Sequence, residues 1–285
     1  MPRPTARAYL DRPGCPLYYE VTGAGPAIVF AHGLGGNHLS WWQQVAHFCT
    51  RFTCVTFAHR GFAPSGEIAG GPDPADYAAD LAALIDHLAL DRVHLVAQSM
   101  GGWSCLDYAL ARPDRVPAIV LASTAGAVAR KATLLRDPHR LDQWIAGAAA
   151  ARESMRRQGI HPAAGERMAR EQPALHFLYQ AIDAMAAAKL DKEALRARMI
   201  ALQTRPPDVL RTLAVPTLFV TGEEDTVFPP FLADPLAALM PNAQVQHVPA
   251  AGHSVYFERA SRFNDLVDRF LASVGKGERR VANGE

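Results

Sequence analysis

The stretch that most constrains this 285-residue chain runs from Val93 to Gly102. A short apolar run stops abruptly at Ser99, and two glycines and a segment with helical spacing follow it. This change from a continuous apolar run to apolar residues at helical spacing predicts a buried parallel strand, a tight turn and a helix. Such a turn strains its central residue, pushes the Ser99 side chain out over the end of the sheet and points free N–H groups toward it. The small residues that the turn needs on either side are Ala97 and Gly101.

The turn resembles the nucleophile elbow of the α/β-hydrolase family, usually written G-x-S-x-G, with Ala97 in place of the first glycine. A second likeness lies upstream, where a predicted strand at 27–31 runs into His32-Gly33-Leu34. In that family a His-Gly loop at this place supplies one of the two backbone donors of an oxyanion hole. The resemblance therefore implies that the N–H groups of Leu34 and Met100 form the hole.

The same resemblance implies an acid and a base after two later strands. The loop after the predicted strand at 215–221 carries Asp225 at the position of the family's acid, with the adjacent Glu224 as the alternative. His253 follows the last predicted strand and occupies the position of the catalytic base. The order Ser99, Asp225, His253 is the order of the catalytic triad in α/β-hydrolases.

The family's fold is a mostly parallel, eight-stranded sheet flanked by helices, and the pattern of this chain fits it. Residues 1–123 and 212–273 are predicted to form that core. Residues 124–211 have no credible strand and are predicted to form an inserted, all-helical cap. Residues 274–285 are polar and are predicted to be a disordered tail.

Composition restricts the partners and the compartment. A formal net charge of +1 gives no electrostatic case for a nucleic-acid partner. The sequence has no apolar run long enough for a membrane span, and its first residues lack the apolar core of a signal peptide. The four cysteines fit neither a C-x-x-C motif nor a disulfide framework, which predicts reduced thiols in a cytoplasmic protein. A monomer and a homodimer both remain open.

The implied triad predicts the chemistry. A serine hydroxyl becomes nucleophilic when a histidine takes its proton, and the carboxylate holds the histidine tautomer, so neither a metal nor an organic cofactor is required. The leading hypothesis is a hydrolase of a small carboxylic ester or lactone that works through an acyl-enzyme on Ser99. The alternatives are a C–C bond hydrolase of a β-diketone or meta-cleavage type substrate and a non-hydrolytic member of the family, such as a cofactor-free oxygenase, a lyase or a small-molecule receptor.

The substrate pocket is predicted from aromatic and apolar side chains near these loops and in the helical segment. Because the core loops carry no cluster of Lys or Arg, they favour a compact, mostly apolar small-molecule substrate. Arg60 lies in a segment that resembles the family's D-x-R-G turn, with Ala58 in place of the acid, and is interpreted as structural. The candidate wall residues are Trp103, Trp144, Phe177, Val227 and Tyr256.

Overall fold

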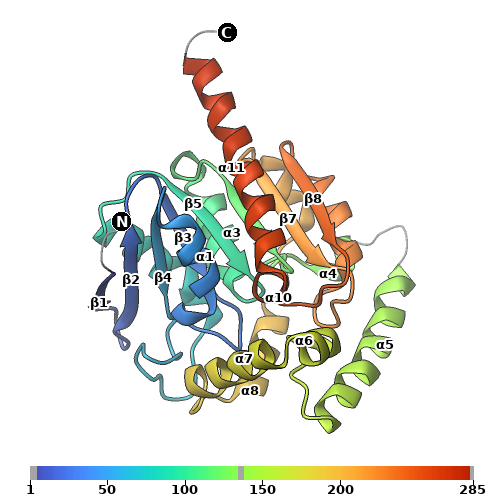
Figure 1. Ribbon diagram of the computed structural model, residues 1–285. Coiled ribbons are helices and arrows are strands. Elements are labelled where there is room, and N and C mark those ends of the chain that lie inside the picture. The colour runs from blue at the N-terminus through green and yellow to red at the C-terminus, as the bar shows by residue number, and fades with distance from the viewer. Residues whose placement is uncertain (1–4, 134–137, 283–285) are drawn as a thin grey trace.

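The computed structural model describes residues 5–133 and 138–282, which form one eight-stranded sheet covered by helices on both faces (Figure 1). The strand order is β1-β2-β4-β3-β5-β6-β7-β8. The pairs β1–β2 and β2–β4 are antiparallel and every later pair is parallel, which confirms the predicted fold class. The strands are β1 Ala6–Leu10, β2 Leu17–Gly23, β3 Ala27–Ala31, β4 Thr53–Phe57, β5 Val93–Gln98, β6 Ile119–Ala122, β7 Thr217–Gly222 and β8 Ala243–Val248.

The helices of the core pack their apolar faces on this sheet. In α2, for example, Tyr77, Leu81 and Leu84 are buried at helical spacing. These helices are α1 Trp42–Phe48, α2 Tyr77–His87, α3 Gly101–Ala111, α9 Ala233–Ala237, α10 Val255–Glu258 and α11 Ala260–Ala282. Short 3₁₀ helices are η1 His38–Trp41, η2 Pro74–Asp76, η3 Pro113–Arg115, η4 Pro207–Thr212 and η5 Pro230–Leu232.

A helical insertion, described over residues 130–133 and 138–201, separates β6 from β7 and lies across the carboxyl ends of the parallel strands (Figure 1). Backbone hydrogen bonds join it to loops of the core, from Ser254 N–H to Ala163 O (3.1 Å) and from Ala63 N–H to Ala186 O (2.8 Å). Its helices are α4 Arg130–Thr133, α5 Pro138–Arg157, α6 Gly165–Glu171, α7 Pro173–Ala186 and α8 Lys192–Ala201.

The carboxyl-terminal segment differs from the sequence-based prediction. Helix α11 continues without a break to Ala282, where a disordered tail was predicted from residue 274. Extending an existing helix avoids the cost of nucleating a new one, and the Lys, Glu and Arg residues of this segment have good helix propensity. Polarity alone therefore did not identify the end of the helix.

Arg60 is structural, as the sequence predicts, although its acidic partners come from further along the chain. Its guanidinium donates to both carboxylate oxygens of Asp80 (2.5 and 2.6 Å) and to Asp76 (2.6 Å). Asp80 also accepts from Arg12 over 3.0 Å. The four cysteines are unpaired and buried, and Cys105 packs in the main core cluster.

Candidate active site

Ser99 occupies a strained turn between β5 and α3. Its φ is +49°, in the left-handed region that residues other than glycine rarely adopt. The Ser99 N–H donates to Ala122 O of the neighbouring strand β6 over 3.0 Å, which holds the turn in place. A Cβ added to Gly101 would lie 2.2 Å from Ala31 O, so only glycine permits α3 to approach β3 this closely. The close packing of α3 on β3 thus explains why the turn needs a small residue at position 101.

The loop that begins at His32 lies against this turn. His32 Nε2 accepts the N–H of His59 (2.9 Å), so its Nδ1–H donates to Gly33 O (2.8 Å). Burial lowers the pKa of His32 to about 3, and the ring is therefore neutral at physiological pH. A Cβ on Gly33 would lie 3.3 Å from the Cβ of Ser99, which brings the start of this loop within van der Waals distance of the serine.

Two backbone N–H groups at this meeting point have no acceptor within the described residues. They belong to Leu34, which follows Gly33, and to Met100, which follows Ser99. Leu34 is partly buried and Met100 immediately precedes α3, where the first N–H groups of a helix have no partner within the helix, so both donors are available for hydrogen bonds. These are the two donors that the sequence resemblance implies.

Asp225 and His253 form a buried hydrogen-bonded pair. His253 Nδ1 lies 2.8 Å from Asp225 Oδ2, and a carboxylate can only accept, so Nδ1 carries the proton. The other carboxylate oxygen accepts the backbone N–H groups of Val227 (2.7 Å) and Phe228 (2.8 Å). The acid is therefore fixed in orientation, and it holds the histidine in the tautomer whose Nε2 can take up a proton.

The amide of Gln98 connects the pair to the turn at Ser99. Its Nε2 donates to His253 O over 3.4 Å, and its Oε1 lies over Gly33, where a Cβ would come within 2.0 Å. Three loops thus meet around one buried side chain. Between the described Ser99 and His253 side chains themselves there is no hydrogen bond.

The alternative acid is turned away from the site. Glu224 accepts from the guanidinium of Arg167 in α6, with the shortest contact 2.5 Å, and this ion pair lowers the pKa of Glu224. Asp225, which is 3% exposed, contacts His253 instead. The structure therefore favours Asp225 over Glu224 as the partner of the histidine.

The five candidate wall residues occupy different environments. Trp103 is buried in one cluster with Met100, against which Leu34 packs, and Val227 is adjacent to Asp225 through its backbone hydrogen bond. Trp144 is partly buried and packs against the main core cluster.

The remaining two candidates, Phe177 and Tyr256, differ most in their exposure to solvent. Phe177 is 73% exposed on α7, and Tyr256 is stacked on Trp41 in the core, with ring centroids 4.2 Å apart.

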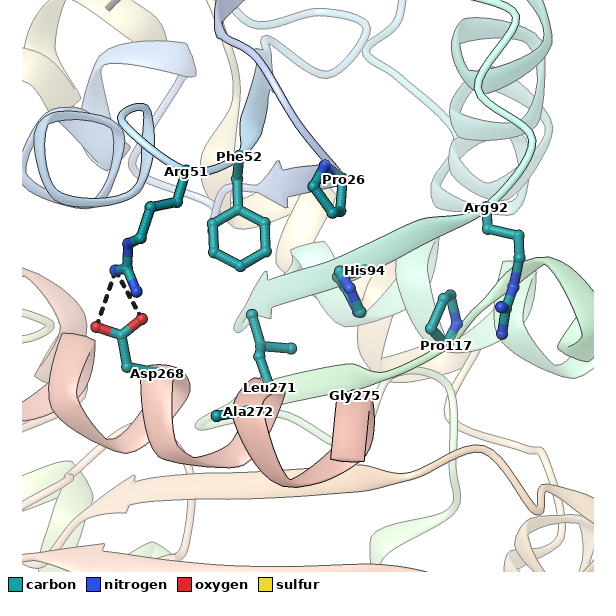
Figure 2. A pocket seen from close by; sticks show the side chains of 10 residues that line it. All are labelled: Pro26, Arg51, Phe52, Arg92, His94, Pro117, Asp268, Leu271, Ala272 and Gly275. Carbon is teal, nitrogen blue, oxygen red and sulfur yellow. Dashed lines mark hydrogen bonds and ion pairs between the residues drawn. The ribbon is translucent and has the colours of Figure 1, made fainter. Parts of the chain in front are cut away.

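An open groove of about 500 Å³ lies elsewhere (Figure 2). Residues at its wall precede or begin β3, β5 and β6, so it opens at the amino ends of the strands, away from Ser99. An ion pair between Arg51 and Asp268 (2.8 Å) crosses one side of it. The lining residues are Pro26, Arg51, Phe52, Arg92, His94, Pro117, Asp268, Leu271, Ala272 and Gly275.

Three residues near the site carry no clear sequence signal. Glu258 is buried, and its Oε1 accepts the N–H of Gly252, next to His253. Arg130 and Arg152 reach the Asp225 loop from the helical insertion. A glutamate or arginine in a helical segment is expected at the surface from its residue type, and only the packing of the helices shows otherwise.

The described residues offer neither a metal-binding cluster nor a membrane-spanning helix. Within 5–133 and 138–282, no group of three or more His, Cys, Asp or Glu side chains is arranged to hold a metal ion. None of the described helices combines the length and the apolar run needed to cross a membrane.

Comparison with known proteins assigns the family. The profile of the α/β-hydrolase fold matches residues 26–260, and the chain therefore belongs to the α/β-hydrolase family. One relative is BpoC of Mycobacterium tuberculosis, provisionally named a non-heme bromoperoxidase, which is 28% identical over 90% of this chain and 98% of its own length.

Two solved structures extend the comparison. A thermophilic esterase from Thermogutta terrifontis has a TM-score of 0.72 and 26% identity, covering 94% of this chain and 99% of its own. Est816, described as an N-acyl homoserine lactone degrading enzyme, has a TM-score of 0.74 and 26% identity, covering 92% of this chain and all of its own. These two neighbours are thus an esterase and a lactone-degrading enzyme.

Proposed function

We propose that this protein is a serine hydrolase of small carboxylic esters or lactones, with Ser99 as nucleophile, His253 as general base and Asp225 as the acid that orients it. The observation that carries the proposal is the His253–Asp225 hydrogen bond, joined through Gln98 to the strained turn at Ser99. The esterase and the lactone-degrading enzyme among the structural neighbours support this substrate class.

The mechanism follows from these positions. His253 Nε2 takes the proton of Ser99 as Oγ attacks the carbonyl carbon, and Asp225 stabilises the imidazolium. Catalytic hydrogen bonds are often absent without substrate and form in its complex, which accounts for the unbonded Ser99 hydroxyl. The negative oxygen of the tetrahedral intermediate accepts from Leu34 and Met100, each donor being worth roughly 3 kcal/mol. His253 protonates the leaving group, and water then hydrolyses the acyl-enzyme by the same steps.

In this proposal the helical insertion is a cap that encloses the substrate. Its position over the carboxyl ends of the strands supports that role, as does the buried cluster in which its residues Leu195 and Met199 meet Met100 and Trp103. Such a cap excludes water and restricts substrate size. The unpaired cysteines support a reducing, cytoplasmic environment.

A substrate panel tests the proposal. Short- and long-chain p-nitrophenyl esters, lactones and β-diketones are assayed with the wild-type protein and with Ser99→Ala. We expect ester or lactone turnover that shows an acyl-enzyme burst, is independent of oxygen and is lost in the variant. Exclusive cleavage of diketones would establish a C–C hydrolase, and activity that stops without oxygen would establish a cofactor-free oxygenase.

A further inference from the structure

Two arginines of the helical insertion lie against the loop that carries Asp225. Arg130 begins α4, and its Cζ is 5.4 Å from the centroid of the Phe228 ring. Arg152, in α5, donates through Nη1 to the carbonyl oxygen of Thr226. Because Thr226 and Phe228 are the neighbours of Asp225 in this loop, both guanidinium groups lie beside the proposed triad.

Neither guanidinium has a carboxylate partner within the described residues. Arg130 Nε is inaccessible to solvent and has no hydrogen-bond acceptor. Burial lowers the pKa of Arg130 to about 10, and burial together with repulsion from Arg156 and Arg196 lowers that of Arg152. The Phe228 ring and the Thr226 carbonyl leave these two partly buried cations without a neutralising charge among the described residues, so an anionic ligand would stabilise them.

Other arginines of the described residues have carboxylate partners. The buried Arg60 has two aspartates, and the more exposed Arg167 has Glu224 and Glu171. The acid whose charge reaches Arg130 and Arg152 is Asp225, and its oxygens already accept from His253, Val227 and Phe228. Asp225 alone therefore does not balance both positive charges, and Arg156 and Arg196 add to the positive charge around Arg152.

We infer that Arg130 and Arg152 bind an anionic group of the substrate, so that the preferred ester or lactone carries a carboxylate of its own. The two guanidinium groups outnumber the one aspartate whose charge acts on both of them, and an anionic group of the substrate would offset this excess of positive charge. A guanidinium fork also matches the geometry of a carboxylate through paired hydrogen bonds. This inference rests on the proposed function, and it replaces the mostly apolar substrate expected from the core loops with one that is anionic at one end.

Matched substrates test the inference. Mono-p-nitrophenyl glutarate carries a carboxylate, and p-nitrophenyl pentanoate has the same acyl length without it. We expect the wild-type protein to prefer the glutarate in kcat/KM. Arg130→Gln and Arg152→Gln should each lower the ratio of glutarate to pentanoate by about tenfold or more, mainly through KM, because charge-assisted hydrogen bonds are the stronger class. Arg130→Lys, which keeps the charge, should retain part of the preference.

The control is Arg157→Gln, which changes an exposed arginine in α5, the helix of Arg152. This variant should leave the ratio of glutarate to pentanoate unchanged. Equal losses on both substrates would overturn the inference, since they would mean that the arginines serve Asp225 or folding. An absent preference in the wild-type protein would overturn it as well.

A binding measurement separates this inference from the proposed function. Monomethyl glutarate is titrated calorimetrically into the wild-type protein and both Gln variants, after thermal melts have shown that the variants are folded. Binding that weakens about tenfold in the variants supports the anion site even if no ester is hydrolysed. Absent binding, or binding that is equal in all three proteins, contradicts it.

Discussion

His253 and Asp225 are 28 positions apart in the sequence, yet the histidine Nδ1 lies 2.8 Å from the Asp225 Oδ2 in a buried contact. The two residues follow adjacent parallel strands, β8 and β7, whose carboxyl ends meet at one edge of the sheet. Strand pairing therefore brings base and acid together, and the backbone N–H groups of Val227 and Phe228 set the orientation of the carboxylate.

The orientation of His253 by Asp225 leads to a prediction about two adjacent acids. Asp225→Asn should reduce kcat by on the order of 10⁴, the loss known for a triad histidine held in the wrong tautomer. Glu224→Gln should stay within about twofold of wild type, as exposed substitutions away from a site usually do, because Glu224 pairs with Arg167. Steady-state kinetics on one ester measure both variants. A large loss in Glu224→Gln with a silent Asp225→Asn would assign the acid to Glu224.

The strained turn predicts which serine is nucleophilic. A fluorophosphonate probe should label Ser99 alone, because this residue combines a positive φ with adjacent free N–H donors. Ser99→Ala should lose labelling and turnover, whereas Ser261→Ala, at an exposed position of α11, should keep both. Mass spectrometry locates the adduct, and an adduct on any other serine would disprove the assignment.

The close contact of α3 with β3 predicts a pair of opposite stability effects. Gly101→Ala places a Cβ 2.2 Å from Ala31 O, a backbone atom that cannot rotate away, and should destabilise the protein by roughly 1–3 kcal/mol. Gly147→Ala, in α5 with nothing within 4 Å of the new Cβ, should stabilise it by roughly 0.5–1 kcal/mol. Urea unfolding measures the two changes. A Gly101→Ala protein as stable as wild type would show that the turn tolerates a larger residue.

The buried Glu258 predicts a pH dependence of stability. Burial raises its pKa from 4.5 to about 7, even though the Gly252 N–H and Arg259 act in the opposite direction. The folded state therefore favours the protonated acid. This contribution to stability is complete below about pH 4.5 and is lost as the pH rises through 7.

In Glu258→Gln the side chain is neutral at every pH and its oxygen can still accept from Gly252. The free energy of unfolding of this variant, relative to wild type, should increase by about 2 kcal/mol between pH 5 and pH 8. Urea titrations at the two pH values measure the difference, with the exposed Glu166→Gln as control. A relative stability that is flat, or that moves in the opposite direction, would show that Glu258 is already ionised at pH 5.

The sequence by itself determined the local features of this protein. The abrupt end of an apolar run at Ser99, the glycines beside it and the His-Gly loop after β3 each specify a backbone conformation within a few residues. The eight strands and the helical character of the insertion likewise follow from the spacing of apolar residues over short stretches of the chain. These features carry the resemblance to the α/β-hydrolase family, and that resemblance predicted the fold class and implied Ser99, Asp225 and His253 as the triad.

Only the tertiary structure decided which side chains surround the site. It buried Glu258, turned Glu224 toward Arg167, left Phe177 in solvent and placed Arg130 beside Phe228. Each of these outcomes depends on how separate helices pack against distant loops. The spacing of residues along a helix does not specify how that helix is rotated about its own axis when it packs against such a loop. A charged residue in a polar helix therefore looks the same in the sequence whether it faces water or a catalytic loop.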